Sequence, residues 1–352
     1  MRSMPKSNLQ NQIKDLFYSE GFDFIGFSSC KIIDDFGYLK DWLDQKYNAE
    51  MDYMGNHKRQ KPVSFLDPSF KSIISCAINY NVLENKINSH NLKKNHGWIA
   101  RYAMIDDYHK ILEKKLKSIA KEIEKFFKNP VRYKVYVDTG PVLERGYAKE
   151  AGIGWMGKNS CLINKDLGSW FFLAEILISE EFAYDEPVKD MCGTCTKCID
   201  ACPTNAIIEA KVIDSNRCIS YLTIENKKVL SKDFVKQVGN NIYGCDICQE
   251  VCPWNSKSKI KNNFNWNLRD EFVSPDLENI LDLVESDWET MKIKSPVKRA
   301  KKNGLIRNIL NAMSNSGEKS YKERILKYID SEDDVISITA EQALIRLDSD
   351  DS

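Results

Sequence analysis

The chain has 352 residues, of which 42% are hydrophobic and 11% aromatic, and its 51 Lys and Arg balance its 51 Asp and Glu. At about 150 residues per domain, this length predicts two or three domains that each bury a core. The apolar content and the zero net charge exclude a disordered chain. The charge balance also argues against a protein that binds polyanions over its whole surface, although it leaves local basic patches open.

The N-terminal sequence lacks the features of an exported or membrane-anchored protein. Residues 1–6 precede a polar amphipathic stretch, and no window approaches the roughly 18 consecutive apolar residues of a membrane span. We therefore expect a cytoplasmic protein. In a reducing compartment the eleven cysteines are expected to bind metal ions or clusters instead of forming disulfides, since eight of them lie between Cys192 and Cys252.

The first half of the chain alternates between helical and strand patterns. From Tyr108 onward, apolar residues recur every three or four positions, which predicts a helix that ends at Asn129-Pro130. The expected helices cover residues 9–18, 36–47 and 108–128, and the expected strands cover residues 22–27, 72–80, 131–137 and 170–178. Strands separated by helices of this length predict an α/β layer structure.

Eight cysteines fall into two groups with the spacing of bacterial ferredoxins. The first group follows C-x2-C-x2-C-x3-C-P over residues 192–203, and the second repeats this over residues 245–253 with one cysteine fewer, which Cys218 can replace. In such runs three thiolates of one loop bind one [4Fe-4S] cluster, and the fourth binds the other cluster. The expected ligands are Cys192, Cys195, Cys198 and Cys252 for one cluster, and Cys218, Cys245, Cys248 and Cys202 for the other.

A pair of zinc sites is the alternative, because zinc ligands also use x2 spacings. Zinc ribbons have no need of a third x2 cysteine or of paired Cys-Pro ends, so the pattern favours clusters. The remaining cysteines, Cys30, Cys76 and Cys161, are expected to be buried apolar residues. Iron-sulfur clusters pass single electrons, so another part of the chain or a partner must receive them.

The region after the cysteines separates its charges along the sequence. Residues 274–290 carry six acids and no base, whereas residues 291–307 carry seven bases and no acid. Three short amphipathic helices are expected at residues 304–313, 321–329 and 335–347, a pattern that fits one or two HEAT-like units. The expected domains are an α/β domain over residues 1–184, a ferredoxin-like domain over residues 185–258 and a helical, HEAT-like domain over residues 259–352.

The α/β half offers a proton donor and one glycine-rich loop as functional candidates. Asp138 ends a strand and can donate a proton if burial raises its pKa toward neutrality, or it can cap the turn before Pro141. His109 is expected to be structural, because no second histidine marks a metal site. The loop over residues 152–160 follows a helical stretch instead of a strand, so it is consistent both with a structural turn and with a cofactor loop that offers Lys158 and Asn159.

Four blocks of this sequence resemble those of the epoxyqueuosine reductases. They are Val-Asp-Thr-Gly-Pro-Val-Leu-Glu-Arg at residues 137–145, Ala-Gly-Ile-Gly-Trp-Met-Gly-Lys-Asn at 151–159, Cys-Ile-Ser-Tyr-Leu-Thr-Ile-Glu at 218–225, and Gly-Cys-Asp-Ile-Cys-Gln-Glu-Val-Cys-Pro-Trp-Asn at 244–255. The likeness covers nearly the whole chain and includes Arg-Tyr-Ala at 101–103 and Asp-Tyr-His at 107–109. It implies the last step of queuosine biosynthesis, in which the epoxide of epoxyqueuosine becomes an alkene at the wobble position of tRNA.

The resemblance also implies cofactors and site residues. It implies a base-off cobalamin that lies between the N-terminal domain and a ferredoxin domain with two [4Fe-4S] clusters. The N-terminal domain becomes the catalytic domain, with Asp138 as the proton donor. The implied cobalamin contacts are Arg101, Asp138, Lys158, Asn159 and Asp246. Arg145 becomes a tRNA contact. This set is sufficient in chemical terms, because loss of the epoxide oxygen as water consumes two electrons and two protons.

The basic run is expected to meet tRNA phosphates, chiefly through Lys298, Arg299, Lys301 and Lys302. The alternative is a solvated helix face that the preceding acids neutralise. The expected partners are tRNA and an electron donor that the sequence does not identify, with no membrane, and the chain is expected to be a monomer. The competing functions are a cobalamin-dependent reductive dehalogenase, which would need an export leader, and an electron-transfer iron-sulfur protein.

Overall fold

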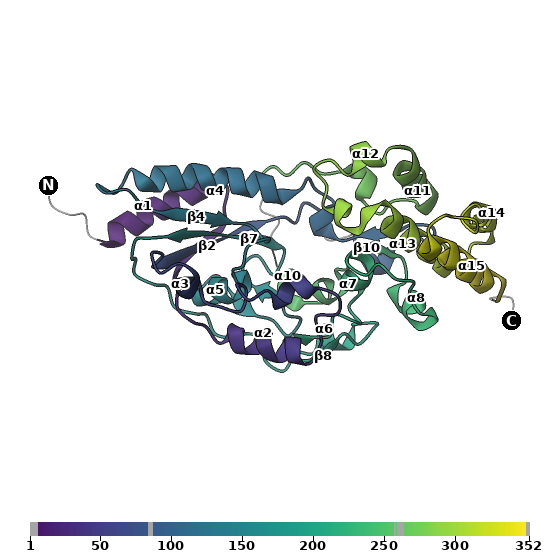
Figure 1. Cartoon of the computed structure of the whole chain (residues 1–352), viewed down its shortest axis with the longest axis horizontal. Helices are drawn as coiled ribbons and strands as arrows, with labels where there is room; N and C mark the ends of the chain where they lie inside the picture. Colours follow the sequence, from purple (N-terminus) through teal and green to yellow (C-terminus); the bar gives the residue numbers. More distant parts are fainter. Residues whose placement is uncertain (1–5, 84–86, 257, 259–263, 350–352) are drawn as a thin grey trace.

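The structure is a computed structural model that describes residues 6–83, 87–256, 258 and 264–349, and Figure 1 shows its elements. Residues 1–5, which belong to the N-terminal segment considered for a signal, lie outside the described residues. Within the described ranges, no helix is both long and apolar enough to span a bilayer.

A four-stranded sheet forms the centre of the N-terminal half. Its strands follow the order β1-β2-β7-β4, and each neighbouring pair is antiparallel. The strands are β1 (Phe24–Ser29), β2 (Ser72–Asn79), β4 (Tyr133–Tyr136) and β7 (Phe171–Ile178). The four expected strands are therefore confirmed, and mixed α/β architecture with them. The central strands β2 and β7 are buried along nearly their whole length, as their continuous apolar runs indicate.

Helices cover both faces of this sheet (Figure 1). Alternate residues of β2 and β7, such as Ile74 and Ile176, pack against α1 (Lys6–Ser19) and α4 (Tyr108–Glu124). The residues between them, such as Ile73 and Leu177, face Tyr147 of α5 on the opposite side. The elements on that side are α2 (Asp35–Asp44), η1 (Asp52–Gly55), α3 (Val63–Leu66) and α5 (Glu144–Glu150). The expected helices at 9–18, 36–47 and 108–128 are confirmed.

The cysteine-rich region contains only short elements, as expected. They are α6 (Lys197–Asp200), β8 (Ile207–Glu209), β9 (Val212–Ile213), α7 (Ile219–Ile224), α8 (Lys232–Val238), β10 (Asn241–Tyr243), α9 (Ile247–Glu250) and α10 (Pro253–Ser256). A small hairpin of β5 (Trp155–Met156) and β6 (Leu162–Ile163) precedes β7 in the chain. The strand β10 pairs in parallel with β3 (Trp98–Ile99), a segment about 140 residues earlier. This pair connects the N-terminal half to the cysteine-rich region.

Helices form the C-terminal part. They are η4 (Asp270–Phe272), α11 (Leu277–Ser286), α12 (Trp288–Met291), η5 (Pro296–Ala300), α13 (Lys301–Ser316), η6 (Lys319–Tyr321), α14 (Lys322–Leu326) and α15 (Asp334–Ser349). Two short 3-10 helices, η2 (Ser89–Asn91) and η3 (Arg101–Ala103), occur in the N-terminal half. The three expected C-terminal helices are confirmed as α13, α14 and α15. Their core also includes Trp98 and Met104, so residues 98–104 pack with the C-terminal helices. The exact domain boundaries and the HEAT-like assignment stay predictions.

Arg307 corrects the interpretation of the basic run. It is only 1% exposed, and its guanidinium donates hydrogen bonds to the backbone oxygens of Leu222, Asn226 and Lys228. A buried arginine with this many acceptors joins α13 to the cysteine-rich region, and it cannot meet a phosphate at the surface. Its helical position gave no sign of this, because the three acceptors come from a segment about 80 residues earlier.

Candidate functional site

A cleft of about 3060 Å³ runs between the sheet and the cysteine-rich region. Its walls include the end of β4, the start of α5, the 155–161 loop and the turn at residues 298–299. Single small-molecule sites typically measure about 300–1,000 Å³. The cleft therefore has room for a large cofactor together with part of a macromolecular substrate.

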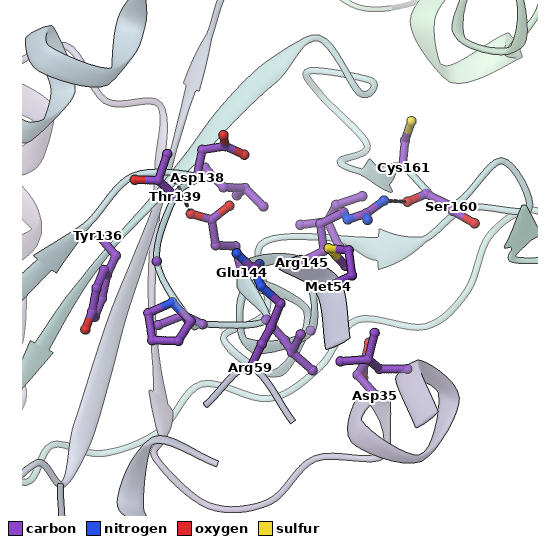
Figure 2. A pocket seen from close by; sticks show the side chains of 18 of the residues that line it. Asp35, Met54, Arg59, Tyr136, Asp138, Thr139, Glu144, Arg145, Ser160 and Cys161 are labelled. Atoms are coloured by element: carbon purple, nitrogen blue, oxygen red, sulfur yellow. Dashed lines mark hydrogen bonds between the residues drawn. The ribbon is translucent and has the colours of Figure 1, made fainter. Parts of the chain in front are cut away.

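Asp138 projects into this cleft from the turn after β4 (Figure 2). Its side chain is 57% exposed, and its backbone is left-handed, with φ of 58°. That conformation is costly for a residue with a Cβ atom, so neighbouring groups must hold it. One such group is Glu144, whose Oε1 accepts a hydrogen bond of 2.5 Å from the Asp138 backbone N–H.

His109 lies between two carboxylates. Its Nδ1 is 2.5 Å from Asp107 Oδ1, and its Nε2 is 3.1 Å from Asp138 Oδ2. The other oxygen of Asp107 accepts from Lys298 Nζ at 2.5 Å. Asp107 also caps the N-terminus of α4, which fixes this arrangement to a long helix. When His109 is protonated, Lys298, Asp107, His109 and Asp138 form an ion-pair chain of four alternating charges, which ends at Asp138 in the cleft.

The charges of this ion-pair chain determine whether His109 or Asp138 holds the proton between them. Burial lowers the pKa of His109, but the hydrogen bonds to Asp107 and Asp138 outweigh it and raise the pKa from 6.5 to about 9. The hydrogen bond from His109 lowers the pKa of Asp138 and outweighs the opposite effect of burial. At neutral pH the imidazole therefore holds a proton and the Asp138 carboxyl is ionised.

These results correct two expectations. Asp138 was expected to hold a proton through a raised pKa, but its pKa is lowered, because His109 supplies a partner for the charged form. His109 was expected to be structural, but it lines the cleft and carries the proton. The sequence signal that could have revealed the role of His109 is the Asp-Tyr-His block, in which Asp107 and His109 are two residues apart at the start of a helix.

The structure separates four of the expected cluster ligands into two cores. Cys252 packs with Cys192, Trp155 and Trp254, whereas Cys218 and Cys245 pack in a separate core. The assignment of all eight cysteines to two clusters stays a prediction. The helices that carry the two x2 runs, α6 and α9, also pack against each other.

Burial raises the pKa of five of these thiols, and the charges that act on them identify near neighbours. The five are Cys198, Cys218, Cys245, Cys248 and Cys252. Cys252 interacts with Cys192 and Cys195, whereas Cys245 interacts with Cys218 and Cys202. Within the described residues, no three His, Cys, Asp or Glu side chains converge on a single metal ion. A [4Fe-4S] cluster spreads its four thiolates over separate iron atoms, so this wider grouping is compatible with it.

Cys161 departs from the expectation of a buried apolar residue. It is partly exposed and lines the cleft, where Figure 2 shows it near Arg145 and Ser160. Burial raises the pKa of its thiol to about 11 against the opposing charge of Arg145, so the thiol stays neutral at physiological pH. Cys30 and Cys76 are buried in the sheet region as expected.

The predicted cobalamin contacts other than Asp138 lie behind the cleft wall. The Asp246 carboxylate accepts from the Arg101 backbone N–H at 2.8 Å and from Trp98 Nε1 at 3.1 Å, and both Arg101 and Asp246 are buried. Lys158 donates to the Gly193 oxygen at 2.8 Å, and Asn159 donates to the Cys248 oxygen at 3.2 Å. None of these four residues is among those that line the cleft. Their side chains bind other parts of the protein, and their roles as cobalamin contacts stay predictions.

The predicted tRNA contacts separate into two groups. Lys298 and Arg299 line the cleft and pair with Asp107 and Glu225, and Arg145, which also lines the cleft, donates to the backbone oxygen of Ser160. By contrast, Lys301 and Lys302 line a second hollow of about 650 Å³, with further cations from Lys227, Lys292 and Lys298. Burial and nearby cations lower the pKa of Lys227, which shows how closely the positive charges gather there.

Titration of His109 tests the ion-pair chain. We expect the His109 imidazole to titrate near pH 9, and Asp107→Asn to lower that pKa, because one of the two partners of the charged form is lost. Histidine resonances followed by NMR across pH 5–10 measure it, with the exposed His57 as a reference. A His109 pKa near 6.5 in the wild type would contradict the chain.

The same shift has a consequence for stability. Because the folded-state pKa of His109 is raised, its contribution to the free energy of unfolding is fully present below pH 6.5. That contribution is lost as the pH rises through about 9. Asp107→Asn should therefore cost most stability at neutral and acidic pH and least above pH 9, which chemical unfolding at several pH values measures.

Two family models match the chain. One, described as epoxyqueuosine reductase QueG, DUF1730, matches residues 59–139, and one described as 4Fe-4S double cluster binding domain matches residues 191–255. The first includes the His109–Asp138 pair, and the second includes all eight of the cysteines expected to bind clusters. Each half of the cleft is thus matched independently.

Curated relatives resemble the chain over most of its length. Epoxyqueuosine reductase from Vibrio cholerae is 37% identical over 325 residues, which cover 92% of this chain and 87% of the relative. The enzyme from Cyclobacterium marinum is 42% identical over 301 residues, which cover 82% of this chain and 92% of the relative.

Solved structures agree with these relatives. Epoxyqueuosine reductase from Streptococcus thermophilus is 31% identical with a TM-score of 0.85, covering 98% of this chain and 90% of that one. The Bacillus subtilis enzyme, solved with its catalytic aspartate loop swung out of the active site, is 27% identical with a TM-score of 0.86, covering 97% and 91%. A complex with an epoxyqueuosine-modified stem loop of tRNA-Tyr is 26% identical with a TM-score of 0.76, covering 98% and 100%. With such identity over so much of both chains, this protein belongs to the epoxyqueuosine reductase family.

Proposed function

We propose that this protein reduces epoxyqueuosine to queuosine at the wobble position of tRNA, the last step of queuosine biosynthesis. The observation that carries the proposal is the cleft, where a protonated His109 and the exposed Asp138 face a region that gathers eight cysteines. Family membership supports the substrate, since one relative was solved with an epoxyqueuosine-modified stem loop. A tRNA substrate places the reaction in the cytoplasm. An electron donor of unidentified class completes the system, and we propose a monomer.

The proposed cofactors are two [4Fe-4S] clusters and a base-off cobalamin. The two sets of four thiols fit the ligand requirement of two clusters. The cleft is larger than a single small-molecule site, and its wall presents aromatic side chains that include the exposed Tyr53 and the partly exposed Tyr102. These residues and Asp138 would contact the corrin. The chemistry that a bound cobalamin supplies is nucleophilic two-electron reduction.

The chain's own residues supply protons. Conversion of the epoxide to an alkene and water takes up two electrons and two protons, so each turnover needs an acid beside the leaving oxygen. His109 Nε2, which holds the proton, lies 3.1 Å from Asp138 Oδ2, and Asp138 is itself exposed to the cleft. Asp138 can therefore take this proton from His109 and donate it to the epoxide oxygen. Solvent water then reprotonates the imidazole, which Asp107 keeps oriented, and the same route supplies the second proton.

Asp138→Asn tests the proton transfer. The amide has the size of the carboxyl but cannot pass on a proton, so we expect queuosine formation to fall by roughly a hundredfold or more, the usual scale for a positioned general acid. Folding, iron content and cobalamin binding should be retained. Turnover on epoxyqueuosine-containing tRNA measures the effect, and Asp166→Asn, at an exposed site outside the cleft, is the control. Near-normal turnover with both cofactors bound would contradict the role of Asp138.

Metal content tests the clusters and their ligands. We expect about eight iron and eight sulfide per chain after anaerobic purification. Cys252→Ala should damage the cluster bound by Cys192, Cys195 and Cys198 and leave about four iron, because the fourth ligands are exchanged between the two runs. Cys30→Ala, which removes a buried thiol outside both sets, is the control. Two zinc ions per chain, with no iron after reconstitution, would overturn the assignment.

The second hollow generates a prediction about tRNA. Replacing Lys301 and Lys302 by Ala should weaken tRNA binding, and the slope of log affinity against log salt should become shallower by roughly one to two, because each lost phosphate contact contributes roughly 0.7–0.9. These two residues are preferred to Lys298, whose loss would also disturb His109. Lys117→Ala with Lys125→Ala, both on exposed positions of α4, is the control. An unchanged affinity and slope would remove the hollow from the binding surface.

A further inference from the structure

Two carboxyl groups lie beneath the turn that carries Asp138. Glu144 begins α5 and lines the cleft, and Figure 2 shows its carboxylate directed toward Asp138 and Thr139, with Arg59 beside it. Glu175 lies in the middle of β7, opposite Ser75 of β2 and Tyr136 of β4. Its side chain is on the face of the sheet that α5 covers, as the alternation along β7 requires.

Glu175 is fully buried beside Glu144. It is 0% exposed, and within the described part of the chain neither of its carboxyl oxygens makes a hydrogen bond of ordinary geometry, although the Glu144 side chain lies close enough to affect its pKa. The hydroxyl of its cross-strand neighbour Ser75 is also buried and unpaired. An isolated buried carboxylate costs far more free energy than a neutral carboxylic acid, so such a group keeps its proton. An apolar residue would avoid the cost altogether, which makes a glutamate in a central strand notable.

The neighbouring charges distinguish the two glutamates. Burial, followed by the charge of Glu144, contact with the Glu144 side chain and the charge of Asp138, raises the pKa of Glu175 well above its ordinary value. Burial and Asp138 also raise the pKa of Glu144, but the Asp138 N–H, contact with the Glu175 side chain and the charge of Arg59 oppose this. Cys76 of the neighbouring strand β2 lies on the opposite face of the sheet, and burial keeps its thiol neutral. The charge of the pair therefore resides on Glu144 and its proton on Glu175.

We infer that Glu144 is a positioning residue that holds the Asp138 turn at the cleft, and that Glu175 keeps Glu144 effective by remaining neutral beneath it. The hydrogen bond from the Asp138 N–H to a carboxylate is charge-assisted and so among the stronger kinds, and it offsets the cost of a left-handed aspartate. A second buried negative charge at Glu175 would repel both Glu144 and Asp138 and weaken this hold. The catalytic significance of the pair rests on the proposed role of Asp138.

The first test measures stability, which does not depend on catalysis. The folded state raises the pKa of Glu175 above the unfolded value of about 4.3, so the folded protein binds more protons than the unfolded chain at pH values between the two pKa values. Its stability therefore falls as the pH rises from the unfolded pKa to the folded one. Glu175→Gln removes this dependence while it keeps the shape. We expect the variant to gain stability relative to the wild type as the pH rises from 5 to 8, in anaerobic chemical unfolding of the cluster-loaded protein.

Glu181→Gln, at an exposed position just after β7, is the matched control for this test and should track the wild type. If the difference between Glu175→Gln and the wild type does not change with pH, Glu175 does not hold a proton in the folded state and the inference is overturned. A Glu175→Gln protein that fails to fold would also count against it, because the amide is neutral and nearly isosteric with the acid.

The second test measures the Asp138 turn directly by hydrogen exchange and mass spectrometry on substrate-free protein. We expect Glu144→Ala to speed exchange in the peptide that contains Asp138 by roughly tenfold, and Glu144→Gln to have an intermediate effect, because the amide still accepts a hydrogen bond but carries no charge. Glu175→Gln should leave the protection intact. Equal protection in the wild type and Glu144→Ala would overturn the positioning role.

Turnover then separates this inference from the proposed function. Glu144→Gln should lower kcat with little change in the KM for tRNA, since Glu144 orients Asp138 and is not expected to bind the substrate. If Asp138→Asn retains turnover while the exchange and stability results hold, the pair positions the turn but the proposed acid is wrong. If the exchange and stability results fail while Asp138→Asn is inactive, the acid stands and the positioning pair is rejected.

Discussion

The contact between His109 and Asp138 determines what the cleft can do. Without the imidazolium, Asp138 would be an exposed carboxylate in a strained backbone conformation, with no proton to give at neutral pH. With it, a proton is stored within one hydrogen bond of the cleft and a negative charge is compensated. The contact also joins separate parts of the chain, since His109 begins α4, Asp138 follows β4, and Asp107 binds Lys298 from the C-terminal helices. Relative movement of these parts would break the His109–Asp138 contact and so change the supply of protons to Asp138.

Much of the fold could be predicted because the responsible patterns are local. The apolar run of β7, the helical spacing of α4 and the x2 cysteine spacing each specify a structure within fewer than 20 residues. The proposed assignment of the cysteines to two clusters also rests on local spacing, except for Cys218, which was chosen because one ligand was missing from the second run. The antiparallel order of the sheet was not expected, since periodicity gives the existence of strands and not their direction.

The properties of the site were harder to predict because they arise from contacts between distant residues. The pKa of Asp138 depends on a histidine 29 residues earlier, and the burial of Arg307 depends on acceptors about 80 residues earlier. Arg101 and Asp246 belong to motifs of the family, but a motif does not reveal whether a side chain binds a ligand or supports the loops that do. Here 145 residues separate the two groups, which meet inside the protein. Glu175 stood in a run that reads as an ordinary buried strand.

The pairing of β3 with β10 bears on how the protein matures. The cysteine-rich region has only short elements of its own, and it is fixed on one side by a strand made much earlier and on the other by Arg307 of a helix made later. Closing such long loops is slow relative to local helix formation, and it requires that all three segments have left the ribosome. The thiols therefore reach their final arrangement only near the end of synthesis. Insertion of the proposed clusters would therefore come after this arrangement has formed, and until then the cysteines would be open to oxidation and to other metals.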